Sequence, residues 1–250
     1  MKLIIISTGW NCENYITSYI QSLKEQTFKD FTVYLIDDAS TDNTLIKARL
    51  AIESDNRFNL IHNEKHLWKT QNFVKIIRDT KIINDNDIII EIDADDKLSN
   101  NNVLYDIYII YQNPSIWICG SRWMNNLGIP NTSWSDGKVV PENARHAWRF
   151  SHMRTYRAFL FRAIKDKDLK FNNEYHKAAC DIGYTIPMLE MAGSQHYFFL
   201  DKITYIYTRH NNHSGTNHAS HGDCNLQRRT ADYIMKLPKY KKIIKHIVNH

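Results

Sequence analysis

The 250-residue chain is poor in glycine and in long apolar runs, and its first two-thirds contain no stretch that concentrates Lys and Arg. Its eight glycines are about 3% of the residues, against a typical ~7%, which excludes collagen-like and glycine-rich architectures. The longest aliphatic runs, residues 3–6 and 88–90, are far shorter than the ~20 residues that a membrane-spanning helix needs. The net charge of +5 is not concentrated in the first two-thirds of the chain, so it does not indicate a nucleic-acid-binding protein.

Cysteine is also scarce, and its spacing carries no metal or redox motif. The chain has four cysteines, which are far apart and form no CxxC pair: Cys12, Cys119, Cys180 and Cys224. Free thiols in a reducing compartment are the simplest interpretation. The apolar stretch at the N-terminus ends at Ser7, too early for the 7–15 apolar residues of a secretory signal, so we interpret it as a first strand. We therefore expect a cytoplasmic protein.

Strand and helix patterns alternate regularly through the first half of the chain. The expected strands are 3–7, 31–36, 58–62, 87–92 and 115–120, and the expected helices are 14–26, 41–54, 70–80 and 102–111. This alternation predicts an α/β fold with a mostly parallel sheet flanked by helices. Ligands bind such sheets at the carboxyl ends of the strands, so functional residues are expected directly after the strands at 3–7, 31–36 and 87–92.

The second half is less regular, and no linker separates it from the first. The expected features are a loop over 123–140, a helix interrupted near Pro187 over 180–192, a strand over 197–207 and a Lys-rich helical tail over 226–250. We predict a single domain over 1–225 followed by this basic tail. The tail is amphipathic, and it could either lie on an anionic membrane surface or dock on the domain with its lysines in water.

The segment Asp93-Ala94-Asp95-Asp96 directly follows the apolar strand at 87–92. Three carboxylates in four residues repel one another unless a cation or hydrogen-bond donors compensate them. Hard divalent cations such as Mg²⁺ take oxygen ligands and bridge carboxylates to substrate phosphates. By itself the segment fits equally a metal site and a polar turn in which one Asp caps the next helix.

A second acidic segment, residues 37–42, follows the strand at 31–36. A helix N-cap explains the hydroxyl residues of this segment but not the adjacent acids Asp37 and Asp38. A carboxylate at a strand end can accept hydrogen bonds from a base or from ribose hydroxyls. The residues at 7–11 contain neither GxGxxG nor GxxxxGK[ST], so the dinucleotide fingerprint and the P-loop are both missing.

Several short segments of the first half occur in a recognisable order. They are Ser7-Thr8-Gly9-Trp10-Asn11, Tyr15-Ile16, Ser22-Leu23, Gln26-Thr27-Phe28, residues 36–44 and residues 92–96. Over about the first 110 residues, this order and spacing resemble the family-two glycosyltransferases of the GT-A fold. Such enzymes are typically inverting, and they move a sugar from a nucleotide diphosphate to an acceptor hydroxyl, usually with Mn²⁺ or Mg²⁺. The resemblance implies a GT-A-type, Rossmann-like fold with a nucleotide-sugar-binding half over 1–112 and an acceptor half over 113–225.

The resemblance also implies donor contacts at the ends of the first two strands. Thr8 and Asp37 or Asp38 would contact the nucleobase and the ribose. Residues 66–72 stand where the family often has a Gly-containing stretch ending in Arg-Asn, and Lys69 would replace the basic residue there. A solvated cation at the start of a helix is the alternative for Lys69. The implied donor is a UDP-sugar, ahead of a GDP-sugar.

The acidic segment at 93–96 gains a metal role from the same resemblance. Asp96 would be the principal ligand of Mn²⁺ or Mg²⁺, Asp95 would share the metal and lie near the ribose and diphosphate, and Asp93 would support both residues and the donor. A His-rich stretch after residue 208 loosely resembles the family's loop over the donor diphosphate, and we assign His213 to the metal shell. The spacing of these histidines matches no zinc motif with paired Cys or His ligands.

An inverting transferase needs a general base, and Asp181 is the candidate. The segment Ala179-Cys180-Asp181-Ile182 precedes an apolar helix, where the family often has Glu-Asp. A helix N-cap is the alternative role for Asp181. The acceptor would be a glycan or a lipid-linked molecule. Two other functions remain open at this point: a nucleotidyltransferase-like enzyme, which usually carries a Gly-rich basic loop that residues 7–11 lack, and a non-catalytic sugar-binding protein of the same fold.

Overall fold

A computed structural model describes residues 1–131, 141–146, 150, 152–209 and 224–244. The main sheet has eight strands in the order β3-β2-β1-β4-β7-β6-β10-β5. Their bounds are β1 Leu3–Gly9, β2 Phe31–Asp37, β3 Phe58–His62, β4 Ile88–Glu91, β5 Lys97–Leu98, β6 Ile118–Asn125, β7 Arg154–Arg157 and β10 Tyr197–Tyr207. Strands β1 to β4 are parallel, as are β6 and β10, whereas β7 and β5 run antiparallel to their neighbours. The predicted α/β fold with a mostly parallel sheet is confirmed, and the sheet is mixed.

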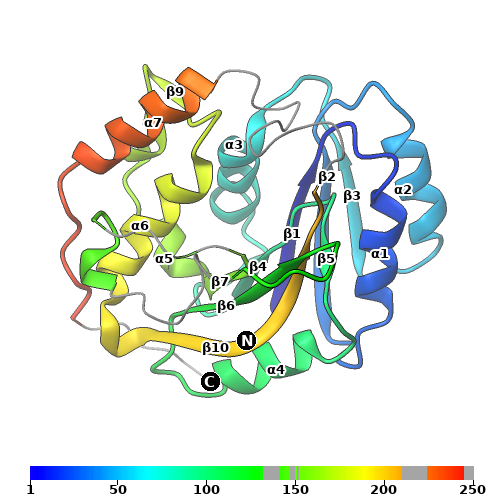
Figure 1. The fold of residues 1–250 in the computed structure, drawn as a ribbon, viewed down its shortest axis with the longest axis horizontal. Helices are drawn as coiled ribbons and strands as arrows, with labels where there is room; N and C mark the ends of the chain where they lie inside the picture. The colour runs from blue at the N-terminus through cyan, green and yellow to red at the C-terminus, as the bar shows by residue number, and fades with distance from the viewer. Residues whose placement is uncertain (132–140, 147–149, 151, 210–223, 245–250) are drawn as a thin grey trace.

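Helices cover both faces of this sheet (Figure 1). One face is covered by α1 Ile16–Lys24, α2 Thr44–Ile52 and α4 Val103–Tyr111. The other is covered by α3 Trp68–Val74 with its continuation η1 Lys75–Asp79, by α5 Ala158–Arg162 and by α6 Cys180–Ala192, on which α7 Cys224–Lys236 packs. Short 3₁₀ turns at Pro141–Asn143, Asp166–Leu169 and Ser194–His196 and a small ribbon of β8 Lys170–Phe171 and β9 Glu174–Tyr175 complete the described elements.

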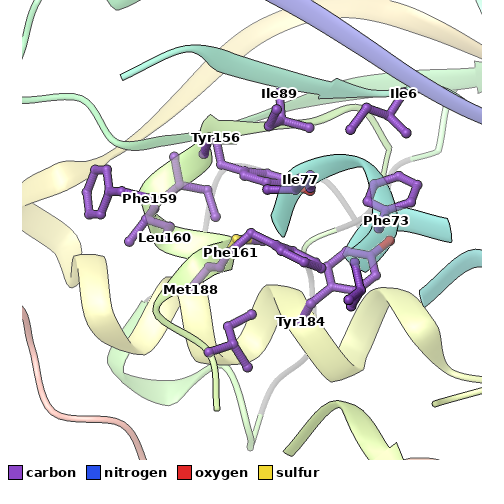
Figure 2. Packing of buried hydrophobic residues seen from close by; sticks show 14 of the residues in the cluster. Ile6, Phe73, Ile77, Ile89, Tyr156, Phe159, Leu160, Phe161, Tyr184 and Met188 are labelled. Carbon is purple, nitrogen blue, oxygen red and sulfur yellow. The ribbon is translucent and has the colours of Figure 1, made fainter. Parts of the chain in front are cut away.

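Strand β1 shows why the sheet is buried on both sides. Successive side chains of a strand point to opposite faces. Ile4 and Ile6 accordingly enter the core under α3 and α6, while Leu3 and Ile5 enter the core under α1. Figure 2 shows Ile6 above Phe73 of α3, whose ring stacks on Tyr184 of α6 at a centroid distance of 5.7 Å. A strand that is apolar on both faces therefore fixes the two helical layers.

The tail differs from the prediction of a helix over 226–250. Helix α7 ends at Lys236, and residues 237–244 are not helical. Pro238 explains the end, because proline has no amide hydrogen for the helix and disfavours helical geometry in the residue before it. The described residues beyond it dock on the domain: the Tyr240 hydroxyl donates to Asp168 Oδ2 over 2.6 Å, and the Ile243 amide donates to the Met191 carbonyl over 2.9 Å.

Two further predictions about local structure were wrong. Helix α6 is continuous through Pro187 rather than interrupted there, because most of its residues are buried and tertiary packing outweighs the lost hydrogen bond. Strand β6 continues to Asn125, inside the expected loop, because it pairs with β10 along its whole length. In the described part of the chain, no helix combines the length and apolar character that crossing a bilayer requires.

Candidate active site

The carboxyl ends of β1, β2 and β4 meet at one edge of the sheet. Gly9 is the register partner of Asp37, the Asp38 amide donates to the Gly9 carbonyl over 2.8 Å, and the Ala94 amide donates to the Thr8 carbonyl over 3.2 Å. Both acidic segments therefore lie against the end of β1. Gly9 permits this approach, since a Cβ there would lie 2.9 Å from both Ala94 Cβ and Cys12 Sγ. The residues expected after these three strands are thus brought together.

The two acids at the end of β2 have different surroundings. Asp38 is saturated with donors: the Leu67 and Trp68 amides at 3.0 and 2.8 Å and Asn63 Nδ2 at 2.7 Å. Asp37 contacts His62 Nδ1 at 2.7 Å through one oxygen, while its buried Oδ1 has no hydrogen-bond partner among the described residues. A buried acceptor without a donor is costly. Asp37 is therefore the acid that remains able to bind a ligand, whereas Asp38 fixes the loop before α3.

Three rings lie beside these acids. His66 stacks obliquely against Trp10 at a centroid distance of 5.2 Å and meets Trp68 edge-on at 4.2 Å. His66 Nδ1 also lies 3.1 Å from Asp38 Oδ2. Aromatic faces of this kind can pack against a planar base or a sugar. The edge of the sheet thus offers an aromatic surface beside Asp38, the residue that follows Asp37 in the chain.

Lys69 is not a solvated cation. Its ammonium lies 2.7 Å from Glu91 Oε1 and 2.5 Å from Asp93 Oδ1, and its side chain is only 17% exposed. Burial opposes its charge, but Asp93 and Glu91 outweigh burial and raise the pKa of Lys69 above its ordinary value. Lys69 therefore neutralises the end of β4, and the alternative of a free cation at the start of a helix is wrong.

A buried ion network connects β4 to the start of α6. Glu91 and Arg154 are register partners on β4 and β7, and Arg154 NH2 donates to Glu91 Oε1 over 2.7 Å. The Tyr184 hydroxyl donates to the same oxygen over 2.7 Å. Arg154 NH1 lies 3.7 Å from Asp181 Oδ2 and has no hydrogen-bond partner among the described residues. Asp181, in the first turn of α6 and 39% exposed, is thereby linked to the acidic segment while staying open to solvent.

Glu91 and Arg154 were missed by the sequence reasoning. Glu91 interrupts the run Ile88-Ile89-Ile90-Glu91-Ile92, and an acid within an apolar strand is a signal, because acids are almost never buried unless they are paired. Burial favours the neutral acid, yet Arg154 and then Lys69 lower the pKa of Glu91 far below its ordinary value. The pattern could have indicated a buried ion pair, but not its partner.

Asp93, Asp96 and His152 form a possible metal site. One potential ligand atom from each of these residues lies within 4.8 Å of the others. Asp95 is adjacent in the chain but is not part of this group, and His213 lies outside the described residues. His152, which the sequence reasoning missed, comes from the segment before β7. The structure therefore brings Asp93 and His152 to Asp96, and these three residues could hold a metal ion together.

Strand β10 holds the acids of this group in place. The Tyr205 hydroxyl donates to Asp96 Oδ2 over 2.6 Å and accepts from the Asp93 amide over 3.2 Å. The Thr208 amide donates to Asp96 Oδ1 over 2.7 Å. These bonds leave lone pairs on both carboxylates, because each carboxylate oxygen can accept more than one donor. The two carboxylates are thus held in a fixed orientation and still have lone pairs available for a ligand.

The electrostatics of the group suit a divalent cation. Burial, followed by the charges of Asp95 and Asp93, raises the pKa of Asp96 well above its ordinary value, so its negative charge lacks sufficient compensation. Burial, followed by the charge of Arg154, lowers the pKa of His152 to about 3, so its ring is neutral and keeps a lone pair for a metal. Two carboxylates and a neutral imidazole are a usual ligand set for a divalent transition ion. The residues present therefore fit a divalent metal.

Comparison with protein families gives one clear match. The model of "Glycosyl transferase family 2" matches residues 4–190. The poly(ribitol-phosphate) beta-N-acetylglucosaminyltransferase TarS of Staphylococcus aureus is 27% identical over 187 residues, which cover 71% of this chain and 31% of that protein. The putative glycosyltransferase EpsE of Bacillus subtilis is 38% identical over 64 residues, 25% of this chain and 23% of that protein. The chain thus spans about a third of the length of TarS.

Solved structures share the fold. The structure of S. aureus TarS 1-349 in complex with UDP-GlcNAc superimposes with a TM-score of 0.67 at 21% identity, covering 94% of this chain and 70% of that one. A mannosyltransferase from Pyrobaculum calidifontis in complex with GDP-Man and Mn²⁺ gives a TM-score of 0.57 at 12% identity, with 93% and 69% covered. With three-quarters of its length matched by the family model, the chain belongs to glycosyl transferase family 2.

Proposed function

We propose that the protein is an inverting glycosyltransferase that moves a sugar from a nucleotide diphosphate sugar to an acceptor hydroxyl. A UDP-sugar is the favoured donor and a GDP-sugar the second, since TarS was solved with UDP-GlcNAc and a more distant relative with GDP-Man. The acceptor is a glycan or a lipid-linked molecule. The free, buried thiols of Cys12, Cys119 and Cys180 fit the cytoplasm, where such donors would be used.

The donor would bind across the edge formed by β1, β2 and β4. Asp37 accepts hydrogen bonds from the base or the ribose through its unpaired Oδ1, and Trp10, His66 and Trp68 provide the apolar wall. Thr8 would contact the nucleobase and the ribose, and Asp95 would lie near the ribose and the diphosphate. Asp93, Asp96 and His152 would hold Mn²⁺ or Mg²⁺, which as a Lewis acid supplies compensation for the charge that develops on the diphosphate.

Asp181 would act as the general base. Its exposed carboxylate accepts the proton of the acceptor hydroxyl, which attacks the sugar on the face opposite the departing diphosphate. Arg154 keeps the carboxylate oriented toward the acidic segment, and Glu91 holds Arg154. Lys69 balances the charge of Asp93 rather than reaching freely toward the donor. The single observation that carries this proposal is the continuous chain of charged contacts from Asp93 through Lys69, Glu91 and Arg154 to Asp181.

A donor panel tests the proposal. The full chain is incubated with UDP-GlcNAc, other UDP-sugars and GDP-Man, with and without Mn²⁺, and both thermal stabilisation and nucleotide release are measured. Asp96→Asn should lose the Mn²⁺-dependent stabilisation by the donor. Asp181→Asn should keep it but release nucleotide about 10²–10⁴-fold more slowly, the usual contribution of a general base. Asp106→Asn is the matched control, because Asp106 lies on α4 and pairs with Lys202 of β10.

Each other outcome contradicts a defined part of the proposal. Stabilisation by no nucleotide sugar would favour a non-catalytic protein of the same fold. Release of pyrophosphate from a nucleoside triphosphate would favour a nucleotidyltransferase. Full turnover by Asp181→Asn would place the base elsewhere.

A further inference from the structure

His152 has a position that the acidic segment alone does not explain. It lies outside the donor half of the chain, yet one of its ring nitrogens is within 4.8 Å of carboxylate oxygens of both Asp93 and Asp96. The chain reaches this position because β7, which follows His152, pairs with β4, which precedes Asp93. A histidine side chain is therefore placed against the carboxylates by the central strands of the sheet rather than by a surface loop.

The imidazole ring is held by aromatic neighbours. It stacks on Tyr205 at a centroid distance of 4.8 Å and 13° between the planes, and on Tyr207 at 5.5 Å and 25°. Trp123 meets it edge-on at 6.1 Å. Tyr205 also donates its hydroxyl hydrogen bond to Asp96. The same side chain thus orients both the ring and a carboxylate, which is the kind of support that keeps metal ligands in place.

The chemistry of a nitrogen ligand limits which cation this site prefers. Mg²⁺ favours an octahedral shell of oxygen ligands and keeps several waters. Imidazole nitrogen is a softer ligand, and it increases affinity for first-row transition ions, in the order that rises from Mn²⁺ toward Cu²⁺. Resting on the proposed function, we infer that His152 supplies a nitrogen ligand to the cation held by Asp93 and Asp96, and that this ligand makes the site prefer Mn²⁺ and later transition ions over Mg²⁺.

Pulsed electron paramagnetic resonance on the full chain with Mn²⁺ and UDP tests the inference without relying on turnover. Wild-type protein should show coupling of the manganese electron spin to an imidazole ¹⁴N. His152→Ala should lose this coupling and bind Mn²⁺ at least about tenfold more weakly, since losing even a residue that only orients a ligand costs about 10–100-fold in affinity, while Mg²⁺ affinity changes much less. His152→Gln offers an oxygen in place of the nitrogen and should reduce the preference for Mn²⁺ without leaving a cavity.

His196→Gln is the matched control, because His196 stacks on Trp117 and its Nδ1 donates to the Ser115 carbonyl, away from the acidic segment. It should keep both the ¹⁴N coupling and the affinity for Mn²⁺. Thermal unfolding of each variant establishes that the fold is retained.

Two results would overturn the inference. One is the absence of ¹⁴N coupling in wild-type protein that binds Mn²⁺, and the other is coupling that persists in His152→Ala but disappears in His213→Ala. In either case, donor binding and sugar transfer by the wild type would leave the proposed function standing. Conversely, if the chain bound Mn²⁺ through the His152 nitrogen but bound no nucleotide sugar, the inference would stand and the proposed function would be contradicted.

Discussion

The hydroxyl of Tyr205 donates a 2.6 Å hydrogen bond to Asp96, which precedes it by 109 positions in the chain. The Tyr205 ring stacks on His152, and its oxygen accepts a hydrogen bond from the Asp93 amide. One buried tyrosine of β10 therefore touches all three residues that could hold a metal. The preorganisation of that group depends on a strand that comes late in the sequence.

Tyr205→Phe should separate the stacking role of the ring from the hydrogen bond of the hydroxyl. Phenylalanine keeps the ring against His152 but leaves Asp96 Oδ2 without its donor, so we expect the free energy of unfolding to fall by about 1–2 kcal/mol. Affinity for Mn²⁺ should fall as well, because the carboxylate is less firmly oriented. Urea unfolding and calorimetric Mn²⁺ titration measure the two effects. Tyr105→Phe, at a half-exposed ring on α4, should change neither; equal behaviour of the two variants would refute the role of Tyr205.

Glu91→Gln should be strongly destabilising. Glu91 is the shared acceptor of Lys69, Arg154 and Tyr184, and both Glu91 and Arg154 are almost completely buried. Removing the negative charge leaves two cations without full compensation, which costs about 3–5 kcal/mol when a buried pair is broken. Denaturant unfolding measures the loss. Glu13→Gln, which removes an acid from a partly exposed pair with Lys47, should have little effect on the free energy of unfolding, and an equally small loss at Glu91 would contradict the network.

His176 should make the protein less stable in mild acid. Both ring nitrogens are buried without hydrogen-bond partners among the described residues, and burial lowers the pKa of His176 from 6.5 to about 4. The unfolded chain therefore binds a proton at a higher pH than the folded one does, so stability is full above pH 6.5 and is lost as pH falls toward 4. Between pH 7 and pH 5 this one group accounts for about 2 kcal/mol.

The variant His176→Gln should reduce this loss. Unfolding free energies at pH 7 and pH 5 should differ by about 2 kcal/mol less in the variant than in the wild type. His196→Gln, at a partly exposed ring, should keep the wild-type difference. An unchanged pH dependence in His176→Gln would show that another group is responsible, and His152, whose pKa is also lowered, would be the next candidate.

Gly9→Ala should disturb the edge of the sheet where the two acidic segments meet. The added Cβ would lie 2.9 Å from Ala94 Cβ and from Cys12 Sγ, so the segment after β4 must move away from β1. We expect a loss of about 1–3 kcal/mol, typical of overpacking, together with weaker Mn²⁺ binding. Adding Ala94→Gly removes one of the two clashing atoms and should restore part of both losses. If neither the stability nor the Mn²⁺ affinity recovered in the double variant, the clash with Ala94 would not be the cause of the loss.

Local patterns predict much of this fold because most elements are defined by their own apolar spacing. The strands Phe58–His62 and Tyr197–Tyr207 and the helix Cys180–Ala192 have the bounds that the sequence predicts. The acidic segment at 93–96 is also placed correctly, because it follows an unmistakable apolar strand. These features depend on neighbours in the sequence, which single-sequence patterns report well.

The partners of that segment could not be predicted in the same way. Arg154 and His152 lie in a stretch of mixed aromatic and basic residues without a clear period, and they reach the acids through the antiparallel register of β7 with β4. Register between strands distant in the sequence is set by packing across the whole sheet. The distinction between Asp37 and Asp38 likewise depends on the loop that returns Leu67 and Trp68 to β2.

Strand β10 pairs in parallel with β6 and antiparallel with β5. Tyr205 within β10 and Thr208 directly after it donate hydrogen bonds to Asp96. During synthesis the N-terminal half emerges first. The hydrogen bonds that Tyr205 and Thr208 donate to Asp96 can form only after residue 208 has been synthesised. Likewise, Glu91 can pair with Arg154 only after β7 has been synthesised. The nascent first half would thus expose the edge of the apolar strand β4, with Glu91 not yet paired with Arg154. A chaperone that covers β4 should therefore bind ribosome-bound chains that end before residue 208 and release chains that extend beyond it.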